Sequence, residues 1–239
     1  HGLKVGERIA LDAPNTDRWR QIHRDDHPLG TYRHNQYEIV GVDGNRIILP
    51  EALRIEFPVI DGANVQKLNP ISHCGIEDIG VEHLNNTFIH SVVFEYGWES
   101  WVRGLEVIKT GNKALYMPNS KRCEVRDSVF DRSWINEGGA AYIGWEQSYD
   151  SIMDNVTTYD MRHAPVYQWA SSGNVIRDSV FHNSDAQWHA GWTNENLFEG
   201  LIVESSQDGG SYGNGMWASG PEDTGHGPNG PRNVVYNCN

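Results

Sequence analysis

A phrase of six residues recurs through most of the chain, and it limits the fold more than any other feature. Its pattern is an apolar residue, any residue, Asp or Gly, any two residues, then an apolar residue or Thr. A repeat of this length, rich in β-branched and aromatic residues and interrupted by Gly, Asn and Asp, is typical of one turn of a β-solenoid. No apolar face recurs every 3.6 residues, as a helical repeat requires. The phrases begin, in steps of 22 to 27 residues, at Ile76, Val102, Val125, Ile152, Ile176 and Phe198.

Two further patterns recur with the same period as the phrase. Polar residues two places ahead of an apolar start should lie above one another at a turn and form a ladder of side-chain hydrogen bonds; they are Asp150, Asn174, Asn196 and Asn233. A second strand is expected about eleven or twelve residues upstream of four phrases, in "KALYM", "AAYIGW", "APVYQW" and "QWHAGW". Six or seven coils spaced roughly 4.8 Å apart would form a rod about 30 Å long.

The chain before Leu68 has a different pattern. "LKVGERIAL" and "YEIVGVDGNRIILPEAL" alternate apolar and polar residues, and the Asp-Gly within the second is a hairpin signal. We therefore predict an all-β protein with a small β subdomain or insertion at residues 1–68 and a parallel β-helix (solenoid) at residues 69–239. A long Gly-rich loop is expected at about residues 205–232.

Charge and hydropathy exclude two classes of partner. The net charge is −13, which argues against binding nucleic acid, because that binding depends on neutralising phosphates. A basic segment at residues 109–132, with six Lys and Arg against three Asp and Glu, is the exception. No stretch approaches the roughly eighteen apolar residues of a membrane span.

Three pieces of the chain resemble known proteins. They are "GLKVGERIAL" with "GVDGNRIILPEAL", "GIEDIGVEH" with "WVRGLEVIKTGNKALYM", and "MRHAPVYQWASSGNVIRDSVFHNSDAQWHAGW". With the coil phrase, they resemble right-handed parallel β-helix proteins of the pectate-lyase-like superfamily, and within it large secreted bacterial proteins of mostly unassigned activity. The resemblance implies a right-handed β-helix and an extracellular place, secreted or at a cell surface. The superfamily includes lyases, hydrolases, epimerases, tailspikes and adhesins, so it selects no reaction.

The strongest candidates for catalysis lie in "YDMRHAPVYQWA" and in the coils beside it. β-Elimination on a uronic acid needs a cation or metal at the carboxylate, a base for the neighbouring proton and an acid for the leaving oxygen. Arg162 could supply the cation, and His163 or His189 the base. The acid would be Tyr142 or Tyr167. The alternative is that all five only pack or bond turn backbones.

Hydrolysis would need two carboxyl groups about 5–10 Å apart across the sugar. Glu137, Asp160 and Asp185 recur in steps of 23 and 25 residues, close to the coil period, so we expect them to form an acidic column. A solvated or calcium-binding ledge is the alternative, because Asp is common at turns. Calcium is therefore the one cofactor the sequence suggests, and the metal ligands stay unknown.

Nine tryptophans suit sugar rings, which present an apolar face beside many hydroxyls. We expect substrate contacts from Trp145, Trp169, Trp188, Trp192 and Lys113. Aromatic stacking within the solenoid is the alternative. His226, between glycines in the Gly-rich segment, is either a site residue or an ordinary loop histidine.

The leading hypothesis is a protein that binds and cleaves a polysaccharide, as a lyase slightly ahead of a glycoside hydrolase. The alternative is a non-catalytic carbohydrate-binding or structural β-helix, such as a surface protein, a tailspike-like module or a filament subunit. Open solenoid ends are exposed sheet edges, so copies of the chain could also associate as a homo-oligomer.

Overall fold

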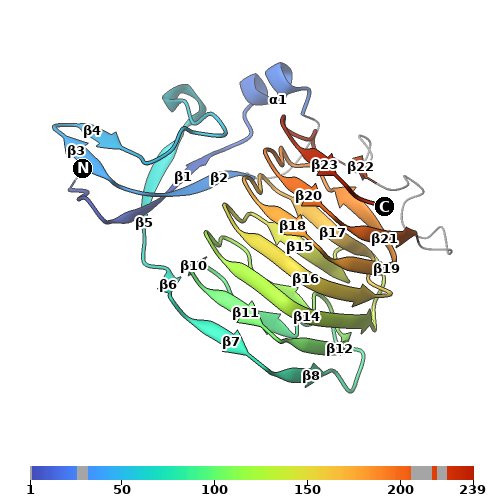
Figure 1. Ribbon diagram of the computed structural model, residues 1–239. Helices are drawn as coiled ribbons and strands as arrows, with labels where there is room; N and C mark the ends of the chain where they lie inside the picture. Colours follow the sequence, from blue (N-terminus) through green and yellow to red (C-terminus); the bar gives the residue numbers. More distant parts are fainter. Residues whose placement is uncertain (1, 26–31, 206–216, 220–224) are drawn as a thin grey trace.

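The chain forms a parallel β-solenoid of about six turns, with a small antiparallel sheet beside it (Figure 1). This description comes from a computed structural model and covers residues 2–25, 32–205, 217–219 and 225–239. The predicted parallel β-helix is confirmed. Most of the predicted Gly-rich loop lies outside the described residues.

The largest sheet of the solenoid, here called the first sheet, bends once in every coil. Before the bend it contains β7 (Gly75–Glu77), β11 (Trp101–Arg103), β14 (Glu124–Ser133), β16 (Ile152–Tyr159), β18 (Val175–Arg177), β20 (Leu197–Glu199) and β23 (Val234–Tyr236). β14 and β16 continue through the bend. There β14 pairs with β12 (Glu106–Thr110), which pairs in turn with β8 (Gly80–Glu82). On the other side β16 pairs with β19 (Val180–Trp188), and β19 pairs with β21 (Ile202–Ser205).

The other sides of the solenoid are formed by shorter strands. β9 (Val92–Val93) and β13 (Leu115–Tyr116) pair in the early coils. In the later coils β15 (Tyr142–Glu146), β17 (His163–Gln168), the end of β19 and β22 (Ala218–Ser219) pair in that order, and together these strands are here called the second sheet. β6 (Ile71–Ser72) and β10 (Gly97–Trp98) begin a third row, which single bridges continue through Lys121, Tyr149, Ser172 and Asn194.

The recurring phrase marks one inward residue and one bend in each coil. The inward residues align across the first sheet as Ile76, Val102, Val125, Met153, Ile176, Phe198 and Val235. Two places later every coil has a left-handed residue with φ between 47° and 62°: Asp78, Gly104, Asp127, Asn155, Asp178, Gly200 and Asn237. Asp, Asn and Gly recur in that third place because they adopt this conformation most readily.

The predicted start at Ile152 is wrong by one residue. Ile152 and Met153 are both apolar, and Asp154 resembles the third residue of a phrase, so the pattern fitted either choice. Met153 is the residue aligned with Val125, and Asn155 takes the left-handed bend.

The same shift corrects the turn ladder, in which Ser151 replaces Asp150. The backbone N–H of Ser151 donates to Asn174 Oδ1 at 3.0 Å, and the Asn174 N–H donates to Asn196 Oδ1 at 3.0 Å. The Asn196 N–H donates to Asn233 Oδ1 at 3.2 Å. The predicted ladder is confirmed for the three asparagines, and each one satisfies a backbone donor of the preceding coil.

The N-terminal residues form the antiparallel sheet and one short helix. Their elements are β1 (Arg8–Ala13), α1 (Asp17–His23), β2 (Arg33–Glu38), β3 (Gly41–Asp43), β4 (Arg46–Ile48), the 3-10 turn η1 (Val59–Asp61) and β5 (Asn64–Leu68). β1 lies between β2 and β5, and β3 and β4 form the hairpin expected around Asp-Gly. Thr16 caps α1 by accepting a hydrogen bond from the Trp19 N–H, and Arg24 ends it in the left-handed region.

β2 runs across the turns of successive coils and fastens the sheet to the solenoid. Gln36 Nε2 donates to the Asn119 carbonyl at 2.7 Å, and His34 Nδ1 lies 2.7 Å from the Tyr149 hydroxyl. Further along, the Trp19 ring packs edge-on against Trp192 at 5.1 Å. The sheet therefore contacts several coils, and each contact limits the sliding of one coil over the next.

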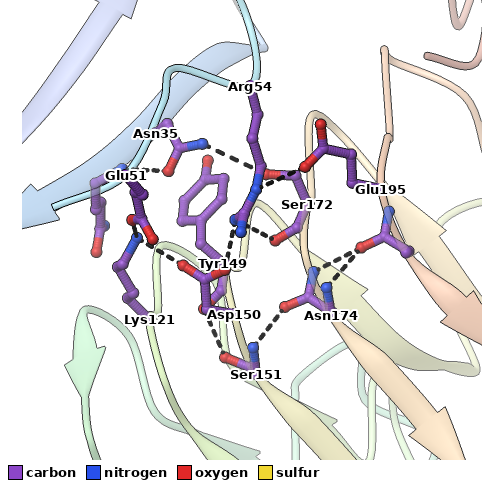
Figure 2. Close-up of polar contacts among 12 residues, drawn as sticks. Asn35, Glu51, Arg54, Lys121, Tyr149, Asp150, Ser151, Ser172, Asn174 and Glu195 are labelled. Atoms are coloured by element: carbon purple, nitrogen blue, oxygen red, sulfur yellow. Dashed lines mark hydrogen bonds and ion pairs between the residues drawn. The ribbon is translucent and has the colours of Figure 1, made fainter. Parts of the chain in front are cut away.

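A network of charges completes this interface (Figure 2). Arg54 reaches from the N-terminal segment to Asp150 at 2.5 Å and to Glu195 at 3.0 Å. Lys121, whose side chain is only 1% exposed, lies 2.7 Å from Asp150 and 2.5 Å from Glu51. Asp150, predicted for the ladder, thus binds cations of the interface. Buried ions need such partners because desolvation costs several kcal/mol per ion.

Candidate functional site

A cluster of titratable side chains lies on the outward side of the second sheet. β15, β17 and β19 place Tyr142, His163 and Asp185 side by side in register. Arg162 directly precedes β17, and His189 directly follows β19. These five residues are here called the histidine cluster. Three successive coils thus gather residues that are 47 positions apart in the chain.

Asp185 holds the His163 ring in place. Its Oδ1 lies 2.9 Å from His163 Nδ1, and its Oδ2 accepts a hydrogen bond from Gln187 Nε2 at 2.6 Å. Because a carboxylate only accepts, the neutral ring carries its proton on Nδ1 and its lone pair on Nε2. The pair has the geometry of an oriented general base.

The Tyr142 hydroxyl joins the remaining members of the cluster. It accepts hydrogen bonds from Arg162 Nη1 at 3.2 Å and from the Gly139 N–H at 3.3 Å, and it lies 3.5 Å from His189 Nε2. The Tyr142 ring also packs against His163, with 4.6 Å between centroids. A phenol beside a guanidinium and two imidazoles can exchange a proton with a bound molecule.

Burial sets the charge state of the two histidines. It lowers the pKa of His163, against the opposing effect of Asp185. The pKa of His189 is lowered to about 3, chiefly by burial. The neighbouring His163 and His226 lower it further. Both rings are therefore neutral near pH 7, and a neutral imidazole can accept a proton.

The cluster is covered, with exposed fractions from 0% for His163 to 7% for Arg162 and Asp185. Its more open margin is formed by Trp169 and His226, which are half-buried. The His226 ring lies 4.7 Å from His189 and 5.5 Å from Trp169. A ligand would therefore approach past these two rings.

A second polar group adjoins the cluster on the side of the earlier coils. Lys113 pairs with Glu146, and its Nζ lies 5.7 Å from the centre of the Tyr142 ring. Glu146 also accepts hydrogen bonds from Tyr116 at 3.2 Å and from Gln168 at 2.5 Å. This group places the predicted Lys113 beside the cluster.

The sequence patterns did not identify Glu146, Gln168 and Gln187 as site residues. The signal was there for two of them, because alternation along a strand puts Glu146 on the same side as Tyr142, and Gln187 on the same side as Asp185. In β17 all six residues are buried, so no alternation identifies Gln168.

Several predicted site residues lie inside the solenoid instead. Trp145, Tyr167 and Trp188 align with one another and belong to the apolar core. The Tyr167 hydroxyl donates to the Leu197 carbonyl at 2.6 Å. Trp145 and Trp188 face inward by alternation along their strands, and a register shift in the pairing of β17 aligns Tyr167 with them. The structure therefore does not bring these three predicted residues to the histidine cluster.

The predicted acidic column does not form. Asp185 aligns with His163, whereas Asp160 accepts a hydrogen bond from Asn183 Nδ2 at 2.5 Å. Asp160 and Glu137 are exposed. Coils differ in the lengths of their turns, so equal sequence spacing did not give equal positions. Trp192 is half-buried and packs against Trp19 and His23 at the N-terminal helix, apart from the histidine cluster.

Within the described residues, no group of three or more His, Cys, Asp or Glu side chains could hold a metal ion. The suggested calcium dependence stays a prediction. No helix in the same residues is long and apolar enough to cross a membrane.

Sequence comparison matches the chain to no protein family and to no curated protein. Among solved structures, the chain is similar to the Gp54 tailspike of Acinetobacter baumannii bacteriophage AP22, determined in complex with A. baumannii capsular saccharide. The TM-score is 0.53 at 10% identity, and the match covers 84% of this chain. It covers 34% of the tailspike chain, so the protein spans about a third of that length. At this identity the likeness shows a shared fold, and membership of the pectate-lyase-like superfamily stays a prediction.

Proposed function

We propose that the protein binds an acidic polysaccharide over the second sheet and cleaves it by β-elimination at the histidine cluster. One observation carries the proposal. The Arg162 guanidinium, the two neutral imidazoles and the Tyr142 phenol lie in hydrogen-bond or ring contact with one another. These are the groups that elimination on a uronic acid requires.

Each residue has a distinct part in the reaction. Arg162 would pair with the uronate carboxylate and so acidify the proton on the neighbouring carbon. His163, oriented by Asp185, would take that proton, with His189 as the alternative base. The electron pair of the broken C–H bond forms the ring double bond as the glycosidic C–O bond breaks. Tyr142 would then protonate the leaving oxygen.

The carboxylates favour elimination over hydrolysis. Within the described residues the cluster contains one carboxylate, Asp185, which is engaged with His163 and Gln187. A glycoside hydrolase normally needs two carboxyl groups facing the same glycosidic bond. The exposed Glu137 and Asp160 do not join Asp185, and Glu146 in the adjoining group is engaged by Lys113, Tyr116 and Gln168.

The tailspike comparison supports the class of ligand. That protein was determined with a capsular saccharide, so a β-helix of this kind can bind a bacterial polysaccharide. By the same analogy we propose that this protein acts outside the cell or at a surface. We also propose that copies of it associate, because the open ends of a solenoid are exposed sheet edges. Calcium would act by bridging substrate carboxylates to the acidic protein.

A non-catalytic saccharide-binding β-helix is the second candidate. It is favoured by the burial of His163, which is 0% exposed. A base that never meets a substrate would serve only to hold the coils together through Asp185. In that case Trp169 and His226 at the margin would be the binding residues.

The test compares the wild-type protein with Arg162→Gln and His163→Gln on acidic polysaccharides, with and without calcium. His182→Gln is the matched control, because His182 lies on β19, the strand that carries Asp185, but bonds Glu204 on the first sheet. Elimination predicts an unsaturated uronide product that both cluster variants lose and the control keeps. Binding without any product from the folded wild-type protein would favour the second candidate.

A further inference from the structure

A hollow of about 330 Å³ lies on the outer face of the first sheet, away from the histidine cluster. It extends over β7, β11 and β14, in the first coils of the solenoid (Figure 1). It is here called the Trp101 hollow, and its lining residues are Glu77, Trp101, Val102, Arg103, Glu124 and Arg126.

Trp101 forms a fixed aromatic platform in this hollow. Its indole lies directly on the backbone of β7, since a methyl group added at Gly75 would lie 2.1 Å from the Trp101 ring. The ring edge is held as well, because Nε1 donates to Glu77 Oε1 at 2.7 Å. The residue is half-buried, so one face is covered and the rest of the ring is available. A pyranose packs its C–H face on such a surface without first ordering it.

The charges around the platform leave one cation available. Arg126 pairs with Glu124 and lies 3.8 Å from Asp154, while Glu77 accepts the indole N–H. Arg103 is exposed, and across the described part of the chain no ion pair is found for it.

Arg103 also lies directly beside Arg126 on the neighbouring strand. On the other side Arg103 lies beside Glu77, which accepts the Trp101 indole N–H. The Arg103 guanidinium is therefore the cation of the hollow that is available to a bound anion.

We infer that the Trp101 hollow is a second saccharide-binding site, which takes a sugar ring bearing a carboxylate. The ring stacks on Trp101 and the carboxylate pairs with Arg103. Its two carboxylates are already engaged, Glu77 by the Trp101 indole and Glu124 by Arg126, so the site binds and does not cleave. It lies on a different sheet from the histidine cluster and does not depend on the function proposed there.

Isothermal titration calorimetry with hexasaccharides of galacturonate and of guluronate, and with neutral cellohexaose, tests the inference. The variants are Trp101→Ala and Arg103→Gln. The matched control is Arg177→Gln, because Arg177 stands in the same outward column but outside the hollow, paired with Asp154 at 2.9 Å. Thermal unfolding of each variant checks folding, and the exposed Arg103 gives a variant whose folding is safe if Trp101→Ala is unstable.

At least one acidic hexasaccharide should bind more tightly than cellohexaose. Trp101→Ala should weaken that binding about tenfold, and Arg103→Gln about fivefold, whereas Arg177→Gln should stay within about twofold. Added salt should weaken the wild-type interaction.

The inference is overturned if no acidic hexasaccharide binds, or if both hollow variants bind as the wild-type protein does. An equal loss in Arg177→Gln would also overturn it, because the effect would then be one of general charge. Arg162→Gln separates the two sites. If Arg162→Gln abolishes all binding while Trp101→Ala leaves it intact, the hollow is not a site, although the histidine cluster still is.

Discussion

Replacing Asn174 by Ala tests whether the turn ladder holds the coils together. The fully buried Asn174 side chain makes three hydrogen bonds. Its Nδ2 donates to the Ser148 carbonyl at 2.8 Å and to Asn196 Oδ1 at 3.0 Å, and its Oδ1 accepts from the Ser151 N–H at 3.0 Å. Alanine removes all three.

The cost of the change follows from which groups keep a partner. The Ser148 carbonyl still accepts from the Ser172 N–H, and Asn196 Oδ1 still accepts from the Asn174 N–H. The Ser151 N–H loses the bond to Asn174 while buried, which costs about 1–3 kcal/mol, and each of the other two lost bonds costs about 0.5–1 kcal/mol net. Asn174→Ala should therefore lower the free energy of unfolding by about 3 kcal/mol.

Urea denaturation followed by far-ultraviolet circular dichroism measures this change, with the exposed Asn86→Ala as control. The control should stay within about 0.5 kcal/mol of the wild-type protein. Asn174→Asp should be worse than Asn174→Ala at pH 7, because its carboxylate faces two acceptors in a buried place, and acid should partly restore it. A loss below about 1 kcal/mol for Asn174→Ala would refute the reasoning.

Three further predictions concern charge and protonation. Arg162→Gln should reduce turnover of an acidic polysaccharide by about 10²–10³-fold in initial-rate assays, because one group that stabilises developing charge is lost; an unchanged rate would remove Arg162 from the reaction. Since burial lowers the pKa of His163, the acidic limb of the pH–rate profile should lie below the ordinary histidine value of about 6.5, and a limb above it would exclude His163 as the base. Burial also lowers the pKa of His34 to about 4, so the unfolded chain binds this proton first as the pH falls. The contribution of the neutral, buried His34 ring to the free energy of unfolding should be complete above about pH 6.5 and decline by about 1.4 kcal/mol per pH unit toward pH 4. Denaturant midpoints of His34→Gln, measured against pH, should lack this decline.

The solenoid was predictable because each coil repeats the same physical requirements. Val125 and Ile176 recur where an apolar residue must face the interior, and Asp127 and Asp178 recur where the backbone turns left-handed. The pattern failed at Ile152, where two apolar residues adjoin and local sequence does not choose between them. Only the register of the neighbouring coils makes that choice.

The candidate site was predictable in part, since stacking brings equivalent positions of successive coils together. Tyr142, Arg162, His163 and His189 were candidates from neighbouring coils, and the structure places them in contact. Asp185 was expected beside other carboxylates but instead binds His163.

The direction of each side chain in the second sheet was harder to predict. The pairing of β15, β17 and β19 is interrupted by register shifts, and every residue of β17 is buried. Alternation in the sequence therefore gave no sign that Tyr167 faces inward. The Trp101 hollow was also missed, because it depends on Gly75 lying opposite Trp101 in the preceding coil.

The most direct test of the proposed activity is to incubate the wild-type protein with a panel of acidic and neutral polysaccharides. Ultraviolet absorbance of unsaturated uronides and the release of reducing ends are followed together. The account predicts that both signals rise in step on at least one acidic polysaccharide. Reducing ends without the absorbance would contradict elimination and indicate hydrolysis, and the absence of both signals across the panel would contradict cleavage altogether.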